Sequence, residues 1–246
     1  MNPAPVLAPD ATVAVIGAGR LGGVLARALH AAGFDVRGPF GRGDEVPESD
    51  IALLCVPDAS IPGAAAVVRP HTRLIGHVSG ATGLADVDFG IHPLQTFTGA
   101  EPPVVFHGIG AAIAGRTPDV RDLAGDLARA LGAHPFEIDD TDRAAYHAAA
   151  SFASNFMLTV LDAAERLALA AGISPTDARA LLAPLVRQSV DNWTAAGAGE
   201  ALTGPIVRGD EVTVARQREA ASDLDLHDLF DALAAGTRSI VRKADA

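Results

Sequence analysis

The sequence predicts an α/β fold, in which a doubly wound parallel sheet is followed by an all-helical C-terminal half. Short apolar runs alternate with helical stretches from residue 12 to about residue 138, and a glycine-rich turn joins the first run to the first helix. Such alternation is typical of a parallel sheet that helices cover on both faces. The strand signal stops at residues 139–142, so we expect a domain boundary between residues 138 and 139.

The elements expected in the first half follow one another in strand and helix order. Strands are expected at residues 12–16, 34–37, 51–56, 73–78, 89–92, 108–115 and 134–138, and helices at 20–33, 58–69 and 118–131. Pro93 should hold His92 in an extended conformation and end the strand there, because proline restricts the residue before it and donates no ladder hydrogen bond.

The second half has the pattern of helices throughout. Asp142 is expected to cap a long helix that ends at Gly172, and Ser174 to cap a further helix that Pro184 kinks. Residues 203–210 predict a loop, and two more helices complete the chain.

Composition and charge narrow the class of protein. The chain of 246 residues is 49% hydrophobic, which is enough to bury a sizeable core. Its formal net charge of -11 argues against a nucleic-acid binder or a protein of anionic membranes. Cys55 is the only cysteine, residues 1–10 lack the basic start and apolar core of a signal peptide, and no run of about 18 apolar residues could span a bilayer. We therefore expect a cytoplasmic protein without intrachain disulfides.

The turn after the first expected strand carries glycines at positions 17, 19 and 22, in the spacing G-x-G-x-x-G. The first permits a tight turn, the second lets the backbone approach a pyrophosphate, and the third lets the helix pack close to the sheet. A turn without a ligand is the alternative, but the position between a strand and a helix favours a dinucleotide. The residues expected to hold it are Gly17, Ala18, Gly19, Arg20, Leu21 and Gly22, which predicts a Rossmann-type domain.

The end of the second expected strand favours NADP over NAD. Domains that bind NAD carry an acidic residue about 20 positions on, which holds the ribose hydroxyls. Here Asp35 lies near the strand start, whereas Arg37 and Arg42 flank the place of a 2′-phosphate, which arginine binds in a bidentate manner. The two arginines could instead be solvated loop residues, and Asp44 could favour NAD.

Residues 55–57 end the third expected strand beside the glycine turn. Val56 and Pro57 should line the cofactor there, because the loops that face a cofactor gather at this edge of such sheets. Cys55 is predicted to be a small core residue, since no neighbouring base is evident.

Polar side chains follow the two strands that come next. Ser79 and His92 both lie at predicted carboxyl ends, where active groups of open parallel sheets gather. Ser79 could also contact the cofactor, and Gln95, just beyond His92, could contact the substrate. His77 lies inside its strand, so a hydrogen-bonded core histidine is the favoured interpretation.

The first helix of the second half carries one polar stripe in an alanine-rich stretch. His147, Ser151 and Ser154 or Asn155 recur at i, i+4 and i+7 or i+8. A solvated helix face is the alternative, but residues 144–161 contain no charged side chain, and buried polar groups need partners or water. We expect the stripe to face a cleft beside the first domain.

The loop at residues 203–210 offers one further binding residue. Arg208 could bind a substrate carboxylate, whereas Asp210 is expected to cap the helix that follows. The eight histidines show no metal-ligand spacing, so we predict no metal.

Five segments together resemble a known family. They are GAGRLG (17–22), HVSGA (77–81), HPLQTF (92–97), YHAAASFASNF (146–156) and TGPIVRGD (203–210). The set is similar to that of the predicted oxidoreductases named for domain of unknown function 2520. The resemblance implies an NAD(P)-binding Rossmann-like domain over residues 1–138. It also implies a helical substrate and dimerisation domain over residues 139–246, similar to that of 6-phosphogluconate dehydrogenase.

Better-understood proteins of this architecture, which include pyrroline-5-carboxylate reductase, imply roles for site residues. Prephenate dehydrogenases are similar in carrying a serine at one strand end and a His-Pro pair after the next, which implies catalytic roles for Ser79 and His92. Ketopantoate reductases use a lysine and an asparagine one turn apart, whereas this chain has His147 and Ser151, with Asn155 a turn later and no lysine nearby. Such relatives usually dimerise through their helical domains, which implies a homodimer.

These features together predict an NADP-dependent oxidoreductase that transfers a hydride to or from a carbonyl or imine of a small carboxylated metabolite. The resemblance makes ketopantoate the first guess for the substrate. His92 or His147 would move the proton, since imidazole can hold or release one near neutral pH, while Ser79 and Asn155 polarise the substrate and Ser151 is a further candidate catalytic residue. The alternative is a nucleotide-binding sensor or interaction protein without turnover.

Overall fold

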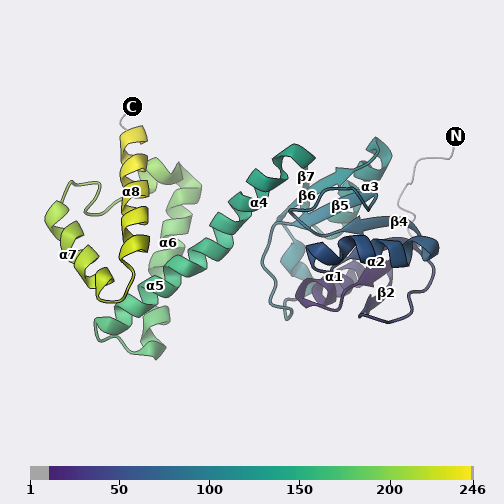
Figure 1. The fold of residues 1–246 in the computed structure, drawn as a ribbon, viewed down its shortest axis with the longest axis horizontal. Coiled ribbons are helices and arrows are strands. Elements are labelled where there is room, and N and C mark those ends of the chain that lie inside the picture. Colours follow the sequence, from purple (N-terminus) through teal and green to yellow (C-terminus); the bar gives the residue numbers. More distant parts are fainter. Residues whose placement is uncertain (1–10, 245–246) are drawn as a thin grey trace. The chain divides into compact units, whose positions relative to one another are not determined.

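The computed structural model describes residues 11–244 and divides the chain into two compact units, one ending at Ser154 and one beginning at Asn155 (Figure 1). Residues 1–10, for which we predicted no signal peptide, lie outside the described part. The last strand of the sheet ends at Glu137, so the helix that follows it belongs to the compact unit of the sheet. The division into a cofactor domain and a helical domain at residues 138/139 stays a prediction.

The first unit is built on a seven-stranded sheet in the order β2-β1-β3-β4-β5-β6-β7. The strands are β1 (Thr12–Ile16), β2 (Asp35–Phe40), β3 (Ser49–Leu54), β4 (Thr72–His77), β5 (Phe89–Pro93), β6 (Gly110–Gly115) and β7 (His134–Glu137). Neighbouring strands from β2 through β5 are parallel, whereas β6 pairs with β5 antiparallel and β7 pairs with β6 parallel. The Rossmann-type α/β fold is confirmed, but the expectation of a wholly parallel sheet is wrong for the last two strands.

The reversal between β5 and β6 has a local cause in the segment that joins them. A parallel neighbour is usually reached through a crossover helix, whereas this segment holds only the 3-10 turn η3 (Pro103–Phe106), which packs against the first helix. β5 ends at Pro93, one residue beyond the predicted end, and His92 lies opposite Ala112 in the antiparallel ladder. His92 is therefore extended, as the following proline predicts.

Helices cover both faces of the sheet (Figure 1). α1 (Arg20–Ala31) and α3 (Pro118–Ala130) pack with one set of alternate β1 residues, and α2 (Ile61–Val68) packs with the other set. Successive residues of a strand point to opposite faces, so α2 covers the face opposite α1 and α3. The 3-10 turns η1 (Asp58–Ser60) and η2 (Arg69–His71) flank α2. Burial on both faces accounts for the continuous apolar runs in these strands.

The segment after the sheet is helical but is not one regular helix. It consists of η4 (Asp140–Asp142), α4 (Arg143–Ser151), a π-helical turn η5 (Phe152–Phe156) and α5 (Met157–Ala170). The predicted single long helix is therefore wrong in its middle, where the π-helical turn widens the helical repeat. Asp142 precedes α4 but makes no side-chain cap, because its own backbone is already helical (φ −100°, ψ −5°). The predicted stop at Gly172 is confirmed by its φ of +88°.

The second unit contains α5 together with α6 (Pro175–Ala201), α7 (Glu211–Ser222) and α8 (His227–Ala244). Ser174 and Asp210 cap α6 and α7 as predicted, since their side chains accept hydrogen bonds from backbone N–H groups three residues on. α6 continues past Pro184, and its non-helical backbone lies at Gly197. Over the described range 11–244, no helix is both long and apolar enough to cross a membrane.

Candidate functional site

Four neighbouring parallel strands end side by side at one edge of the sheet. In space they follow the order β1, β3, β4, β5, and their carboxyl ends carry the glycine turn, residues 55–57, the turn of residues 78–83 and His92. Adjacent strands lie about 4.8 Å apart, so His92 is three strand spacings, roughly 14 Å, from the glycine turn. This edge therefore brings together the predicted cofactor residues of the first three strands with Ser79 and His92.

The three glycines of the turn between β1 and α1 differ in whether packing within the protein excludes a side chain at their position. Gly17 has a φ of +113°, and a Cβ there would lie 2.3 Å from the Cys55 carbonyl oxygen. A Cβ on Gly22 would lie 1.9 Å from the Gly17 carbonyl oxygen. Gly19 has an ordinary φ of −75° and nothing within 4 Å of its Cβ position. Protein packing thus requires Gly17 and Gly22, whereas the space beside Gly19 is open to a ligand.

The first turn of α1 is suited to binding an anion. Gly19 at the N-cap position provides no side-chain cap, and no acidic residue lies in the first turn. The N–H groups of this turn and the positive end of the helix dipole therefore remain available to a phosphate. Of the other residues in the turn, Ala18 and Arg20 are exposed and Leu21 is half-buried.

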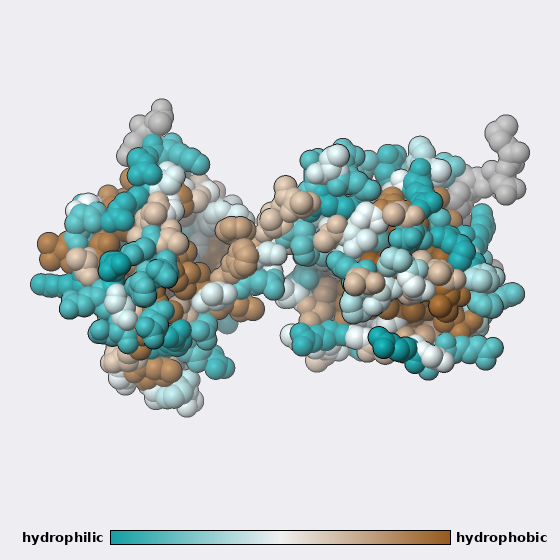
Figure 2. Space-filling model, viewed as in Figure 1, coloured by the Kyte–Doolittle hydropathy of each residue, from teal (hydrophilic) through white to brown (hydrophobic). Residues whose placement is uncertain are grey.

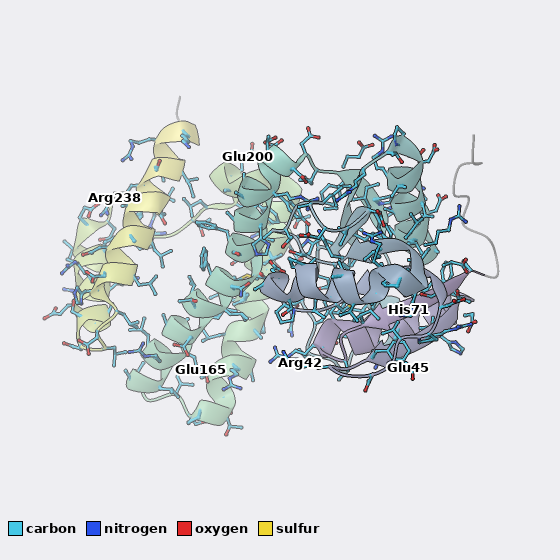
Figure 3. All side chains as sticks on the ribbon, turned by 45° about the vertical axis from the view of Figure 1, so that its right-hand side comes forward. Arg42, Glu45, His71, Glu165, Glu200 and Arg238 are labelled. Atoms are coloured by element: carbon cyan, nitrogen blue, oxygen red, sulfur yellow. The ribbon has the colours of Figure 1, made fainter. Side chains whose placement is uncertain are left out.

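The two arginines considered for a 2′-phosphate have different surroundings. Arg37 lies within β2, where its guanidinium donates to the Glu48 carbonyl oxygen at 2.8 Å and pairs with Asp35 at 3.4 Å. Arg42 lies exposed just after β2 (Figure 3). Asp44 closes this turn by accepting a hydrogen bond from the Gly41 N–H at 2.7 Å. Arg42 is therefore the more exposed of the two arginines, and the side chain of Arg37 is engaged by Glu48 and Asp35.

Residues 55–57 border the glycine turn from the end of β3. A Val56 side-chain carbon lies 3.3 Å from the Cβ position of Gly17. Burial raises the pKa of the Cys55 thiol to about 12, so the thiol stays protonated and unreactive at neutral pH. This agrees with the predicted core role of Cys55. Pro57 directly precedes η1.

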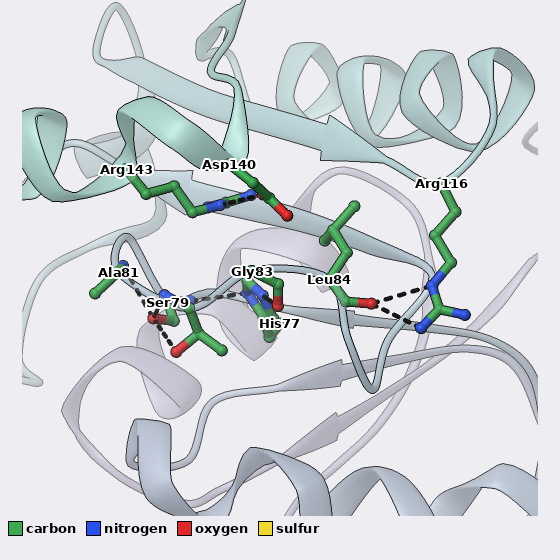
Figure 4. Close-up of polar contacts among 9 residues, drawn as sticks. His77, Ser79, Ala81, Gly83, Leu84, Arg116, Asp140 and Arg143 are labelled. Carbon is green, nitrogen blue, oxygen red and sulfur yellow. Dashed lines mark hydrogen bonds and ion pairs between the residues drawn. The ribbon is translucent and has the colours of Figure 1, made fainter.

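The turn after β4 is held by its own hydrogen bonds (Figure 4). His77 is fully buried, accepts from the Ser79 N–H through Nδ1 at 3.2 Å, and donates from Nε2 to the Gly83 carbonyl oxygen at 3.2 Å. The Ser79 hydroxyl donates to Thr82 Oγ1 at 3.0 Å and accepts from the N–H groups of Ala81 and Thr82. Burial lowers the pKa of His77 and keeps it neutral. The prediction of a satisfied core histidine is confirmed.

His92 meets two side chains of α4 at the carboxyl end of β5. Its Nδ1 lies 2.6 Å from the Tyr146 hydroxyl, and its ring centroid lies 6.2 Å from that of His147. Gly80 fits between the two imidazoles, because a Cβ there would lie 2.9 Å from His92 Cε1 and 3.0 Å from His147 Nδ1. The predicted proximity of His92 and the His147 helix is confirmed within the first unit.

Burial, together with a neighbouring histidine and arginine, keeps His92 uncharged. Burial is the main cause that lowers its pKa to about 4, followed by His147 and Arg143. The Arg143 side chain is itself buried and donates to the Asp140 carboxylate at 2.6 Å (Figure 4), which lowers the pKa of Asp140. Burial also raises the pKa of Tyr146 to about 12. At neutral pH the imidazole of His92 and the phenol of Tyr146 are therefore both neutral.

The remaining predicted residues lie on other segments. The Gln95 amide oxygen accepts a hydrogen bond from the Thr96 N–H at 2.8 Å. Ser151 ends α4, Asn155 lies in the π-helical turn at the start of the second unit, and Arg208 lies in the loop before α7. The predicted i, i+4 spacing of His147 and Ser151 is confirmed within α4, whereas the π-helical turn interrupts its regular continuation to Ser154 and Asn155. The site roles of these residues stay predictions.

Between residues 11 and 244, no three His, Cys, Asp or Glu side chains are grouped so that they could hold a metal ion.

Three residues beside His92 were not predicted from the sequence, namely Tyr146, Gly80 and Arg143. Tyr146 precedes His147 in the chain, but an aromatic residue in an alanine-rich helix suggests packing rather than chemistry. Arg143 did carry a usable signal, because a cation in the first turn of a helix opposes the helix dipole and needs a local reason. Gly80 carried no signal in the sequence, because its lack of a side chain is required by two imidazoles that only the fold brings next to it.

Comparisons with known proteins agree with this architecture. A profile of the family described as domain of unknown function (DUF2520) matches residues 109–237, which is more than half of the chain. A comparison with curated protein sequences found no match.

Three solved structures resemble the chain over nearly its whole length. A candidate NADP oxidoreductase from Bacteroides fragilis has 20% identity and a TM-score of 0.80 over 94% of this chain and 99% of its own. A Thermotoga maritima protein described without an activity has 20% identity and a TM-score of 0.75 over 95% and 100%. Plasmodium falciparum pyrroline carboxylate reductase with NADP bound has 11% identity and a TM-score of 0.62 over 94% and 98%. At these identities the likeness shows the fold alone.

Proposed function

The chain belongs to the family described as domain of unknown function (DUF2520), and on this premise we propose that it is an NADP-dependent oxidoreductase. It would reduce a carbonyl or imine of a small carboxylated metabolite, or oxidise the corresponding product. Two proteins of similar fold support this general kind, since one is described as a candidate NADP oxidoreductase and one is a pyrroline carboxylate reductase with NADP bound. Ketopantoate is the first substrate to test.

The observation that carries this proposal is that an open glycine and a histidine pair share one edge of the sheet. Among the described residues, and apart from its own chain neighbours, no atom lies within 4 Å of the Cβ position of Gly19, and its backbone conformation does not require glycine. A pyrophosphate that approaches the turn closely would account for it. A dinucleotide held there would extend along the ends of β3 and β4 toward Ser79 and His92.

The residues of the first unit fit such a cofactor. Residues 17–22 would hold the pyrophosphate on the N–H groups that open α1, and Val56 and Pro57 would line it from β3. Arg42 would bind the 2′-phosphate. When bound, the nicotinamide supplies or accepts the hydride.

The chain itself would orient the substrate and move the proton. His92 and His147 are the candidate proton donors, and Ser79 lies on the neighbouring strand end. From the sequence argument, Ser151, Asn155 and Gln95 remain candidates for polar contacts with the substrate, and Arg208 for its carboxylate.

Nucleotide binding is the first test. Saturating NADPH should raise the melting temperature of the full chain more than NADH does, because a ligand at about 100 times its Kd stabilises by about 2.7 kcal/mol. Arg42→Ala should weaken NADPH binding about tenfold and leave NADH binding nearly unchanged. If neither nucleotide shifts the melting temperature, the cofactor assignment is wrong.

A pair of glycine variants tests where the nucleotide binds. Gly19→Ala and Gly63→Ala both place a methyl group in open space, one in the turn and one in α2. We expect Gly19→Ala to weaken NADPH binding at least tenfold without lowering the melting temperature of the free protein, and Gly63→Ala to change neither. Equal effects of both substitutions would mean that no phosphate approaches residue 19.

Turnover separates an enzyme from a sensor. NADPH consumption is followed at the nicotinamide absorbance against a panel of 2-keto acids, led by ketopantoate, and cyclic imines. Turnover with any member supports the oxidoreductase. Tight NADPH binding without turnover across the panel favours the alternative, a nucleotide-binding sensor on the same fold.

We also propose that the chain forms a homodimer through its helical unit. Leu158 on α5 and Leu181, Leu185 and Trp193 on α6 are each at least 60% exposed, and Figure 2 shows brown, apolar areas on this unit. Exposed apolar surface of this kind marks interaction sites. Analytical ultracentrifugation should show a dimer, and Leu185→Glu should shift it toward monomer. A monomeric wild type would contradict the proposal.

A further inference from the structure

The hydrogen bond between Tyr146 and His92 has a defined direction. Nδ1 of His92 and the phenol oxygen of Tyr146 lie 2.6 Å apart, and both groups are neutral near pH 7. A neutral imidazole carries one proton, and the nitrogen that carries it is set by the bond the other nitrogen makes. A phenol is much more acidic than a neutral imidazole N–H, so the phenol donates. The imidazole proton of His92 therefore lies on Nε2.

Nε2 is the nitrogen of His92 that remains open. Its Nδ1 bond to Tyr146 is the hydrogen bond that His92 makes to the protein. In the described part of the chain, Arg121 Nε is the one buried side-chain nitrogen or oxygen of a non-exposed residue without a partner. Nε2 of His92 is therefore in contact with solvent, although most of the side chain is buried. An N–H group in this position can donate to a ligand.

We propose that Tyr146 is a positioning residue that sets the tautomer of His92 and returns a proton to it, so that His92 donates from Nε2 as a neutral imidazole. The inference rests on the proposed oxidoreductase function and selects His92 over His147 as the donor. His147 also lies next to Gly80, but Tyr146, the one tyrosine of the chain, bonds to His92 rather than to His147.

The proposed proton transfer balances in the reducing direction. The N–H bond at Nε2 breaks as its proton goes to the substrate oxygen or nitrogen, which gains the electron pair while the bound NADPH is oxidised. The O–H bond of Tyr146 breaks as its proton goes to Nδ1, so the imidazole ends neutral as its other tautomer. A proton from water then goes to Nε2 as the Nδ1 proton returns to the tyrosinate oxygen, which restores the starting tautomer and releases hydroxide to the solvent. Burial disfavours this tyrosinate, and Arg143 acts against that effect by lowering the pKa of Tyr146.

The surroundings of His92 disfavour the usual imidazolium donor. At a pKa of about 4, roughly one His92 side chain in a thousand carries a second proton at pH 7. The titratable and charged groups that face it are His147, Arg143 and Tyr146 of α4, His77 of β4 and Asp58 of η1. Asp58 acts to raise the pKa of His92, whereas Arg143 and the two histidines act to lower it. A proton relay from the phenol of Tyr146 lets His92 donate a proton without first becoming an imidazolium.

The direction of the hydrogen bond can be measured without any ligand, because Tyr146 is the only tyrosine in the chain. The Raman Fermi doublet of tyrosine has a low intensity ratio when the phenol donates and a high ratio when it accepts. We expect a low ratio in the full wild-type chain near neutral pH, and a higher ratio in His92→Leu, which removes the acceptor. A high ratio in the wild type would overturn the proposal, whatever the enzyme activity.

The relay itself is tested by kinetics with NADPH and the best substrate of the panel. Tyr146→Phe keeps the ring and should lower kcat about 10- to 100-fold with KM for NADPH unchanged. Its rate in mixtures of H2O and D2O should report one proton in flight, whereas the wild type reports two. Phe136→Leu is the matched control, because the ring centroids of Phe136 and Tyr146 lie 5.9 Å apart and phenylalanine has no proton to relay.

The outcomes of these experiments separate the two proposals. Full kcat in Tyr146→Phe, or two protons in flight in both proteins, would overturn the relay while leaving the oxidoreductase standing. A failure of the chain to bind NADPH would overturn the proposed function, and the Raman ratio would then still decide whether Tyr146 sets the His92 tautomer.

Discussion

His77 and His92 lie on neighbouring strands of one sheet and differ in what their two nitrogens do. His77 is fully buried and bonds through both nitrogens to backbone groups of its own turn. His92 bonds to Tyr146 through Nδ1 and leaves Nε2 open to solvent. Burial lowers the pKa of both, so charge does not distinguish them. On the proposal that His92 is the proton donor, the free nitrogen, rather than residue type or the direction of the pKa shift, separates it from the structural His77.

The largest effect should come from replacing the histidine with the free nitrogen. We expect His92→Gln to lower turnover at least about 100-fold, because general acid catalysis typically contributes that much, while the fold is retained. NADPH consumption measures the loss, and circular dichroism checks folding. His147→Gln should cost less than tenfold. An equal loss in the two variants would remove the distinction between the paired imidazoles.

Replacing the other histidine should damage the fold rather than the chemistry. His77→Leu leaves the Ser79 N–H and the Gly83 carbonyl without partners, and each unsatisfied buried group costs about 1–3 kcal/mol. We expect the free energy of unfolding in urea to fall by about 3 kcal/mol. A change below about 1 kcal/mol would mean that the turn does not depend on His77.

The depressed pKa of His92 should make stability depend on pH. Its pKa is about 6.5 in the unfolded chain and about 4 when folded, so between these values the unfolded chain binds more protons. The contribution of His92 to the free energy of unfolding is therefore most favourable above pH 6.5. The free energy of unfolding falls as pH drops toward 4, by on the order of 2–3 kcal/mol. Urea unfolding should show this loss in the wild type and a smaller one in His92→Gln. Identical pH profiles would contradict the shift.

The smallest effect is expected for the serine of the turn after β4. The Ser79 hydroxyl makes three hydrogen bonds within its turn, so Ser79→Ala should lower the free energy of unfolding by about 1 kcal/mol. Turnover should fall less than tenfold. A loss comparable to that of His92→Gln would instead support the catalytic role that the resemblance to prephenate dehydrogenases implies.

The elements that position the site were predictable because their signals are local. The glycine turn requires its residues through short-range packing, with Gly17 and Gly22 in direct steric contact. The caps at Ser174 and Asp210 are likewise local, because each side chain accepts a hydrogen bond from the backbone N–H group three residues on. His92 was predicted at a strand end because Pro93 acts on the residue before it.

Other features depend on contacts between distant segments and carry little local signal. The antiparallel pairing of β5 and β6 depends on how the linker packs against α1. The bond between His92 and Tyr146 joins residues 54 positions apart. The hydrogen-bonding positions of the Ser79 hydroxyl are occupied because of the path that the whole turn takes. The sequence alone does not distinguish such a serine from one that is exposed to solvent. The π-helical turn also interrupts the polar stripe, whose spacing is regular in the sequence.

Gly80 carries no functional group, yet it limits which residues its position can accept. Because a methyl group there would overlap both His92 and His147, alanine at this position would have to move one imidazole or the other. The two imidazoles can therefore lie this close to residue 80 because glycine has no Cβ atom, and not because a bond holds them there. A search of the chain for reactive side chains would overlook residue 80, although a change there should affect the site about as directly as a change in either histidine.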